Sequence, residues 1–353
     1  MEFGVQFFPC VRPAEKSAQA YWQEALSLTA LAEKFGFAHV RTVEHYFHYY
    51  GGYSPSPLVF LSAAAAITTR MRLVTGAVLP VFSNPLKLAG EIGMVDAISG
   101  GRLDVGIARA FLPHEFARFA VPLDESRERF DEGLQQLKAL LESENATSKG
   151  KFHSFSNVTS LPRPTQQPRP PFWIAALSTP DSFINAGRAG HHLMAIPMGG
   201  AKMAELLDLY RKAWRDAGHP GHGKIMLAFH MFCAPTAEEA IAKSRHEINR
   251  YLKSIIDGAS DWVGGASSRD YPNYDKILNA LAQETFESQV EKGGAWIGTP
   301  DEVRAQITSY SELVGGFDVA SLQVNFGLVS VDDAANSMRL FAQEVMPHFK
   351  QGG

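Results

Sequence analysis

A glutamate and a histidine stand directly after a short apolar run. The run covers residues 38–43, and Glu44 and His45 follow it. In folds built from parallel strands, residues at the carboxyl end of a buried strand face the active-site opening. Histidine changes its protonation state near neutral pH, so it can pass protons to and from a reacting group. The pair predicts acid–base chemistry; the alternative is a strand end whose side chains only bond to neighbouring loops.

Two other strand ends carry groups that could hold an anion. Arg109 offers a fixed fork of donors. Residues 178–182 read Ser-Thr-Pro-Asp-Ser, a helix start whose hydroxyls and free backbone N–H groups suit a phosphate. Gly76 leaves room for a flat ring, and aromatic residues end the first strand. These groups predict a site for a flat, phosphorylated cofactor. The alternative is an arginine–carboxylate pair and an ordinary helix cap.

Other common chemistries have no motif in this chain. It contains no Gly-x-Ser-x-Gly elbow, no Walker loop and no Gly-x-Gly-x-x-Gly after a strand. His45 with His48, and His191 with His192, lack carboxylate or cysteine partners at ligand spacing. We therefore expect no metal site.

Eight apolar β-like runs alternate with helical segments along the chain. The predicted strands cover residues 3–8, 38–43, 71–79, 103–108, 172–176, 191–196, 225–232 and 320–326. Strands that each precede a helix form a parallel sheet, because every crossover helix returns the chain to the same edge. The sequence therefore predicts an α/β fold, a (β/α)8 TIM barrel, with an open doubly wound sheet as the alternative.

Two excursions interrupt this alternation. Residues 145–171, after the fourth strand, are rich in proline, and residues 258–298 come before the last strand. The first reads as a rigid surface connector, with a proline-rich ligand for another domain as the alternative. We expect both to be insertions in a single domain spanning residues 1–353.

Composition indicates a globular protein with ample core material. Hydrophobic residues make up 45% of the chain and charged residues 20%, with a formal net charge of −4. This balance argues against nucleic acid or an anionic membrane as an obligate partner. The chain has 2 cysteines, no basic start followed by a long apolar run, and no membrane-spanning stretch. We therefore expect a cytoplasmic protein.

Several longer segments together resemble a known family. They include Glu44-His45-Tyr46-Phe47 followed by Gly51-Gly-x-Ser-Pro55, Arg72-Leu-x-Thr-Gly-Ala-Val-Leu-Pro80, Asp96-x-x-Ser-Gly-Gly-Arg102, Glu115-Phe116 and Gly298-Thr-Pro-Asp-Glu-Val303. The segments are similar to those of the bacterial luciferase-like monooxygenases. The resemblance implies a barrel that takes reduced FMN (FMNH2) and reacts it with O2 through a C4a-flavin hydroperoxide to oxidise a small organic substrate. A separate NAD(P)H:flavin reductase would supply the reduced flavin.

The resemblance also implies roles for individual residues. His45, in the same motif as Glu44, matches the family's catalytic histidine. Thr75 and Gly76 match a strand end where the family places a non-prolyl cis peptide against the flavin ring. Phosphate contacts are implied for Arg109, Ser178, Thr179 and Ser182. Two departures stand out: Tyr46 replaces a frequent second histidine, and Ala110 follows Arg109 where the family usually has glycine.

Two other functions stay open at this point. Similar barrels use the deazaflavin coenzyme F420 for hydride transfer without oxygen, and a flavin-binding protein without turnover is a third reading. The motif around His45 favours the flavin-dependent monooxygenase. We also expect a homodimer, because the helix after the second strand carries alanines 63–66 and the next helix carries Gly90 and Gly93. Small residues of this kind permit close contact between helices.

Overall fold

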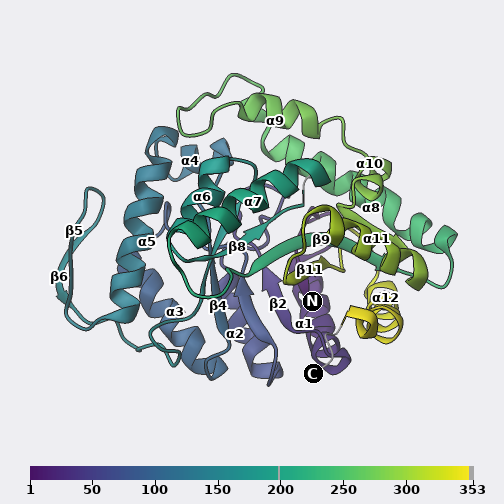
Figure 1. Ribbon diagram of the computed structural model, residues 1–353, viewed down its shortest axis with the longest axis horizontal. Coiled ribbons are helices and arrows are strands. Elements are labelled where there is room, and N and C mark those ends of the chain that lie inside the picture. The colour runs from purple at the N-terminus through teal and green to yellow at the C-terminus, as the bar shows by residue number, and fades with distance from the viewer. Residues whose placement is uncertain (198, 350–353) are drawn as a thin grey trace.

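The computed structural model describes residues 1–197 and 199–349, and its centre is a closed barrel of eight parallel strands (Figure 1). β9 pairs with both β8 and β11, and β11 pairs with β1, so the sheet closes on itself. The barrel strands are β1 (Glu2–Phe7), β2 (His39–Thr42), β3 (Arg72–Thr75), β4 (Leu103–Ile107), β7 (Phe172–Ala176), β8 (His192–Ala195), β9 (Ile225–Cys233) and β11 (Val319–Gln323). The predicted barrel is confirmed, and the alternative of an open sheet is wrong.

An outer ring of helices covers the barrel (Figure 1). Side-chain caps begin several of them; for example, Ser17 accepts a hydrogen bond from the Ala20 N–H at the start of α1. Proline occupies the first turn of α2, α3, α6 and α11, where its missing N–H costs nothing. The ring consists of α1 (Ala18–Phe35), α2 (Pro57–Ile67), α3 (Pro85–Ser99), α5 (Ser126–Glu142), α6 (Pro180–Arg188), α7 (Gly200–Asp216), α8 (Ala237–Gly258), α11 (Pro300–Leu313) and α12 (Val331–Glu344).

Both excursions are insertions, as expected, but they contain elements that the sequence did not predict. The first holds an antiparallel hairpin of β5 (Ala146–Lys149) and β6 (Ser154–Val158), which projects beyond α5 in Figure 1. The second holds α9 (Tyr274–Leu281), α10 (Phe286–Glu291) and β10 (Ala295–Gly298), which adds to the far end of β9. The single domain proposed for residues 1–353 includes residue 198 and residues 350–353, which lie outside the described residues.

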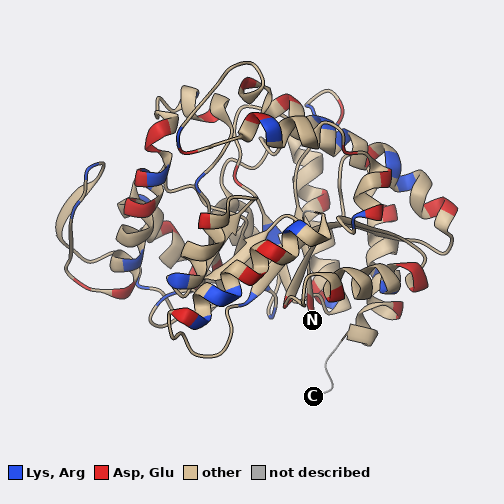
Figure 2. Cartoon of the chain, turned by 45° about the horizontal axis from the view of Figure 1, so that its top comes forward, with Lys and Arg blue, Asp and Glu red and all other residues tan. Residues whose placement is uncertain are grey.

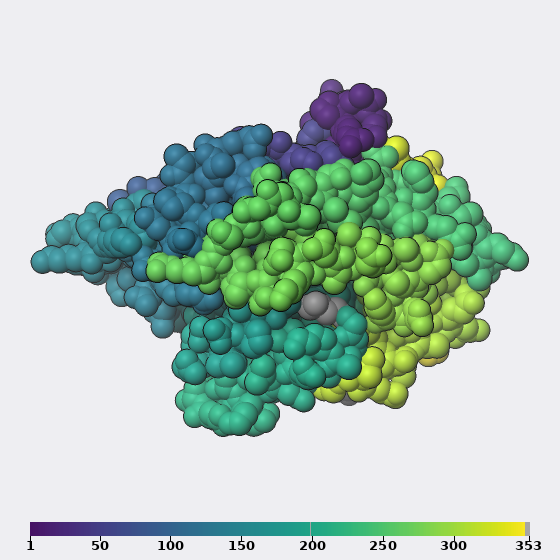
Figure 3. Space-filling view, turned by 90° about the horizontal axis from the view of Figure 1, so that it is seen from above, coloured from purple at the N-terminus to yellow at the C-terminus, as the bar shows by residue number. Residues whose placement is uncertain are grey.

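The second excursion crosses the face of the barrel at the carboxyl ends of the strands. Figure 3 shows it as the green segment that lies between the blue and teal helices. Three hydrogen bonds join it to the loop after β4: Arg109 Nη1 to Asp270 O (2.8 Å), Tyr271 Oη to Ala110 O (2.9 Å) and Trp262 Nε1 to Phe111 O (2.8 Å). This excursion therefore covers part of the barrel opening.

Charged residues of both signs are spread over the outer helices, while the strands are mostly uncharged (Figure 2). The lower lumen of the barrel is filled mainly by apolar residues, Val74, Trp173, Met194, Met226 and Val319, and it also holds the buried polar pair His39 and Ser321, whose Nε2 and Oγ are 3.0 Å apart. Within the described ranges, no helix has the length and apolar character that crossing a membrane would need. The lumen is thus a packed floor below the strand ends, as in other barrels of this type.

Candidate active site

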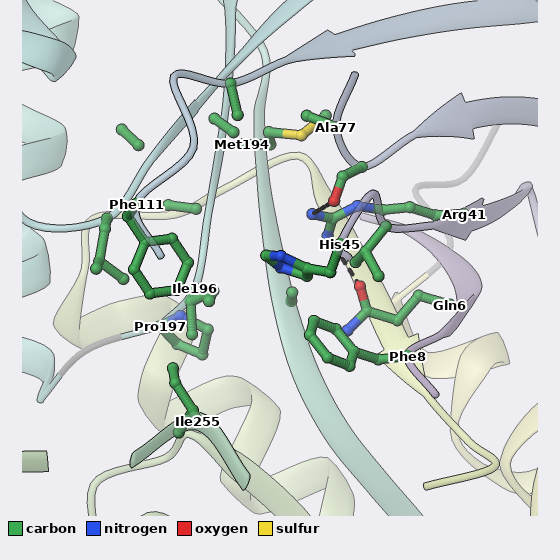
Figure 4. A pocket seen from close by; sticks show the side chains of 18 of the residues that line it. Gln6, Phe8, Arg41, His45, Ala77, Phe111, Met194, Ile196, Pro197 and Ile255 are labelled. Atoms are coloured by element: carbon green, nitrogen blue, oxygen red, sulfur yellow. Dashed lines mark hydrogen bonds between the residues drawn. The ribbon is translucent and has the colours of Figure 1, made fainter. Parts of the chain in front are cut away.

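A cavity opens at the carboxyl ends of the strands, and all eight barrel strands or the loops directly after them contribute to its wall. Together with its open mouth it encloses about 1300 Å³. That volume includes open solvent at the mouth, and the part in which the centre of a water molecule fits is about 190 Å³. Figure 4 shows Gln6, Phe8 and Arg41 on one side, and Phe111, Ile196 and Pro197 across the cavity.

His45 lies in this cavity wall, and a buried carboxylate fixes its ring. Its Nδ1 is 3.1 Å from Oε1 of Glu115, a fully buried residue of α4 (Pro113–Arg118). The same oxygen accepts the backbone N–H of Tyr46 at 2.8 Å. Because Oε1 already acts as an acceptor for the Tyr46 N–H, Nδ1 donates to it, and Nε2 is the nitrogen that can exchange a proton with a ligand. Phe8 and Tyr50 pack against the imidazole, with ring centroids 5.6 and 5.0 Å away.

Glu44 is also buried in the cavity wall, but it bonds to the protein. Oε1 accepts the Tyr46 hydroxyl at 2.6 Å, and Oε2 accepts the backbone N–H of Leu79 at 3.3 Å. Burial raises the pKa of the Glu44 carboxyl to about 8. Tyr46, where the family frequently has a second histidine, thus ties Glu44 to the loop after β2.

The two residues at the end of β3 have different positions. The Gly76–Ala77 peptide is cis and is not prolyl, at the position that the resemblance implies. Gly76 lies in the cavity wall, and a Cβ there would stand 2.0 Å from Nε of Arg41, so a side chain is excluded. Thr75 is fully buried, and its hydroxyl donates to the Gly106 carbonyl at 2.8 Å. Gly76 therefore faces the cavity, whereas the Thr75 side chain holds β3 to β4.

The residues expected at a phosphate lie at one rim of the cavity. Arg109, Thr179 and Ser182 line it, from the end of β4 and the start of α6. The Ser178 hydroxyl is buried without a hydrogen-bond partner among the described residues. Arg109 donates to the Asp270 carbonyl and stacks on Tyr271, and no ion pair to a carboxylate is recorded for it within the described part of the chain. An unused hydroxyl, a guanidinium and a helix start fit a phosphate.

Ala110 adopts a backbone conformation that explains the family's usual glycine. Its φ is 65°, in the left-handed region where glycine avoids the clash of a Cβ. The Tyr271 hydroxyl donates to the Ala110 carbonyl and holds the turn in place. Ala110 therefore adopts, with a side chain, a backbone conformation that glycine would adopt more easily.

Three residues of the site were given no role from the sequence. Glu115 appeared only as part of a segment shared with the family, and nothing in its surroundings indicated contact with His45. Arg41 and Gln6 point into the cavity from the middle of β2 and β1. A signal existed for Arg41, since it is a charged residue inside an otherwise apolar run. Over residues 1–197 and 199–349, no group of three or more histidine, cysteine or acidic side chains is arranged to hold a metal ion.

The fold and the cavity define a parallel (β/α)8 barrel whose opening holds a buried histidine and, at one rim, groups that suit a phosphate. The family model for luciferase-like monooxygenases matches residues 1–315. The oxygenase component of the flavin-dependent trigonelline monooxygenase of Acinetobacter baylyi is 27% identical over 343 residues, covering 96% of this chain and 92% of that protein. The crystal structure of monooxygenase RslO1 from Streptomyces bottropensis is 43% identical, has a TM-score of 0.88, and covers 99% of this chain and 100% of its own.

More distant structures share the fold alone. The oxygenating constituent of 3,6-diketocamphane monooxygenase from Pseudomonas putida, in complex with FMN, has a TM-score of 0.82 at 21% identity, covering 98% of each chain. An F420-dependent secondary alcohol dehydrogenase has a TM-score of 0.76 at 15% identity, covering 99% of each chain. The chain belongs to the luciferase-like monooxygenase family and is an oxidoreductase.

Replacing Glu44 with glutamine should change how stability depends on pH. The folded-state pKa of about 8 lies above the ordinary value of 4.5, so the folded protein holds the proton more tightly than the unfolded chain does. The contribution of Glu44 to the free energy of unfolding is therefore fully present below pH 4.5. It is lost as the pH rises towards 8, by up to about 1.4 kcal/mol per pH unit. Glu44→Gln keeps an acceptor for Leu79 and cannot ionise. Its stability relative to wild type should therefore rise between these pH values and stay level above them.

Urea unfolding at pH 5, 6, 7, 8 and 9 measures this difference. Glu238→Gln, at an exposed position in the first turn of α8, is the control and should show no such trend. If the free energies of unfolding of wild type and Glu44→Gln differ by the same amount at pH 5 and at pH 8, Glu44 ionises normally in the folded protein.

Proposed function

We propose that this protein is a flavin-dependent monooxygenase that uses reduced FMN and O2 to oxidise a small organic substrate. The observation that carries the proposal is the His45–Glu115 pair, which faces the same cavity as the phosphate-suited rim of Arg109 and residues 178–182. Membership of the luciferase-like monooxygenase family supports it. When bound, reduced flavin supplies the electrons that activate O2. The C4a-flavin hydroperoxide route implied by the resemblance stays a prediction.

The residues of the cavity divide the work of binding and proton handling. Arg109, Ser178, Thr179 and Ser182 would hold the phosphate, where charge-assisted bonds and the helix start favour an anion. Gly76 offers a flat surface without a side chain, which suits close approach of an aromatic ring. His45 would hold or pass a proton at Nε2, and Glu115 keeps the ring in that orientation. Glu44 would act by fixing Tyr46 and Leu79 around His45.

The proposed cofactor and partners follow from the same features. One phosphate rim and no dinucleotide motif favour FMN over FAD. The relative from Acinetobacter baylyi is named as an oxygenase component, and a diketocamphane monooxygenase of the same fold is described with FMN. We therefore expect a separate NAD(P)H:flavin reductase to supply FMNH2, with the protein acting in the cytoplasm. An assay coupled to such a reductase, which measures O2-dependent product, tests the function directly.

Coenzyme F420-dependent hydride transfer is the second candidate, because an F420-dependent dehydrogenase has the same fold. A flavin-binding protein without turnover is the third, and the buried, oriented His45 argues against it. The absorbance spectrum of the bound cofactor separates the first two, since a deazaflavin and a flavin absorb differently.

Replacing Arg109 with alanine should weaken FMN binding. Losing one charge-assisted contact to a phosphate typically costs on the order of 1.5–3 kcal/mol, which is about ten- to a hundredfold in affinity. Anaerobic titration with reduced FMN measures the dissociation constant. Arg188→Ala, at an exposed position in the last turn of α6 and thus away from the helix start, removes a side chain whose one recorded hydrogen bond among the described residues is to Asn185, and it should bind FMN like wild type. An unchanged dissociation constant in Arg109→Ala would leave Arg109 with only its contacts to Asp270 and Tyr271.

Replacing His45 with alanine should lower substrate turnover by about 10²–10⁴-fold, the usual contribution of a positioned acid or base. Reduced FMN should still bind and still be consumed by O2, with hydrogen peroxide appearing in place of oxidised product. Product, peroxide and thermal stability are measured side by side. His246→Ala is the control, because that side chain is 81% exposed on α8. Normal turnover in His45→Ala would make His45 a structural residue, and loss of folding would make its role one of packing.

We also propose that the protein is a homodimer that pairs through α2 and α3. Gly90 and Gly93, which first suggested this, face residues 161 and 162 of the same chain. A Cβ on Gly93 would stand 2.2 Å from the Pro162 carbonyl oxygen, so this glycine allows close packing within the chain. Exposed apolar side chains now carry the argument: Val59 and Ile67 on α2, and Leu86, Met94 and Ile98 on α3. Neighbouring helices with such surfaces are typical of an interface.

Two substitutions on these helices test the dimer. Val59→Lys with Met94→Glu should place charges on the surface of α2 and α3 and shift the mass in light scattering from dimer to monomer at micromolar concentration. Leu313→Lys, at an exposed apolar position on α11, is the control and should leave the mass unchanged. A monomeric mass for the wild-type protein would overturn the proposal.

A further inference from the structure

A ring of polar side chains lies in the lumen just above its mainly apolar lower part. Gln6 on β1 is in register with Arg41 on β2 and with Gln323 on β11, and Gln323 is in register with His230 on β9. All four side chains line the same cavity. Barrel lumens are usually filled by bulky apolar residues, as most of the layer below is apart from His39 and Ser321. Four adjacent strands therefore share one polar layer, which we call the lumen ring: Gln6, Arg41, His230 and Gln323.

The lumen ring carries a buried positive charge without a carboxylate partner. Arg41 is 7% exposed, and its recorded bonds go to neutral oxygens: Nη1 to Gln6 Oε1 at 2.9 Å and Nη2 to the Gly76 carbonyl at 3.3 Å. Burial lowers its pKa to about 10, so it stays charged at neutral pH. No ion pair is recorded for Arg41 among the residues that the structure describes. Buried charges are normally paired, so the missing partner points to a ligand.

Other polar atoms of the lumen ring are also unused. Arg41 Nε, Gln323 Nε2 and His230 Nε2 are buried without hydrogen-bond partners in the described part of the chain. Burial lowers the pKa of His230 to about 3, so this imidazole is neutral and adds no charge. The ring thus offers spare N–H donors from Arg41 and Gln323, and from His230 in the tautomer that carries its proton on Nε2, together with one net positive charge, while the Gln6 carbonyl oxygen already accepts from Arg41. Such a set matches an acceptor with negative charge.

The walls above the lumen ring are largely apolar and include several aromatic residues. Phe8, Tyr50, Phe111 and Tyr251 line the cavity around it, among aliphatic residues such as Val43 and Ile255. Figure 4 shows Arg41 and Gln6 beside His45 and Phe8, with Phe111 and Ile255 across the cavity. The phosphate-suited rim with Arg109 belongs to the loop after β4 and the start of α6, so the cavity has two separate cationic groups. If the cofactor phosphate occupies the rim with Arg109, Arg41 remains for a second, smaller molecule.

We propose that the lumen ring binds the acidic oxygen of the organic substrate, so that the substrate is a ring-containing anion: a carboxylate, or an ionised phenol or enol. Arg41 is its charge partner, and Gln323 and His230 are its further donors. The inference rests on the proposed function in one respect, since it takes the molecule beside the flavin to be the substrate. It makes Arg41 and its neighbours the residues that select for charge and orient the substrate towards His45.

Titration of the purified full chain with benzoate and with its neutral counterpart benzamide tests this site by calorimetry. Wild type should bind benzoate at least tenfold more tightly than benzamide. Arg41→Gln should weaken benzoate binding by about ten- to a hundredfold and leave benzamide unchanged, as expected for one charge-assisted contact. Arg41→Lys keeps the charge but not the forked donors of the guanidinium, so its affinity for benzoate should lie between those of wild type and Arg41→Gln. Arg109→Ala is the control for location and should bind benzoate like wild type.

Each result decides the proposal. Equal binding of benzoate and benzamide by wild type overturns it. The proposal is also overturned if Arg109→Ala loses the preference for benzoate over benzamide while Arg41→Gln keeps it, because benzoate would then bind at the phosphate rim. Weaker binding of reduced FMN in Arg41→Gln, with benzoate unaffected, would assign Arg41 to the flavin and also overturn it.

A second variant covers the case in which Arg41→Gln does not fold, as judged by circular dichroism. Gln323→Leu removes an unused donor and keeps the charge, so it should lower benzoate affinity several-fold, and an unchanged affinity overturns the proposal. The titrations with benzoate contain no flavin and no reductase. Their failure therefore overturns the anion site alone, whereas a lack of O2-dependent product overturns the proposed function.

Discussion

The buried carboxylate of Glu115 is the contact on which the cavity depends. It accepts hydrogen bonds from His45 Nδ1 and from the Tyr46 backbone N–H, and so joins α4 to the loop after β2. The neighbouring His114 lies between two carbonyls, with Nδ1 2.9 Å from the Gly258 oxygen and Nε2 3.1 Å from the Tyr46 oxygen, and the nitrogen that carries the proton donates. It thus brings the start of the excursion that covers the opening next to the loop after β2. Three segments far apart in sequence therefore meet at one helix of six residues. A histidine held in this way has one free nitrogen, and its direction is set by the fold.

The sequence predicted the parts of the structure that depend on repeated local pattern. Eight apolar runs, each followed by an amphipathic helix, were enough for the barrel, because parallel strands with crossover helices have few ways to pack. The elements that were missed are short or depend on distant partners. The Ala295–Gly298 strand has four residues and forms only because β9 extends past β8 to receive it. The hairpin of residues 146–158 lacks the apolar alternation that signals a strand.

The site was predictable where a residue stands at a strand end, and not where its partner comes from elsewhere. His45, Gly76 and Arg109 follow apolar runs, and the structure brings all three to one cavity. Thr75 is one residue earlier, and alternation along the strand turns its hydroxyl towards β4. Arg41 is inside a strand, where position alone suggests packing. Its importance comes from Gln6, Gln323 and His230, whose register across three other strands cannot be read from one run of residues.

The distribution of charge in the cavity follows from burial. Two carboxyls, Glu44 and Glu115, lie near His45. Burial, with a smaller contribution from Glu115, raises the pKa of Glu44 to about 8, so Glu44 is mostly neutral at pH 7, and Glu115 is the carboxyl that bonds to His45. Opposite it stand two cations without carboxylate partners recorded among the described residues, Arg41 in the lumen and Arg109 at the rim. Because a buried cation is costly without a counter-charge, a cavity built this way favours two anionic groups, one at each end. A phosphorylated cofactor supplies one, and the acidic oxygen proposed for the substrate supplies the other.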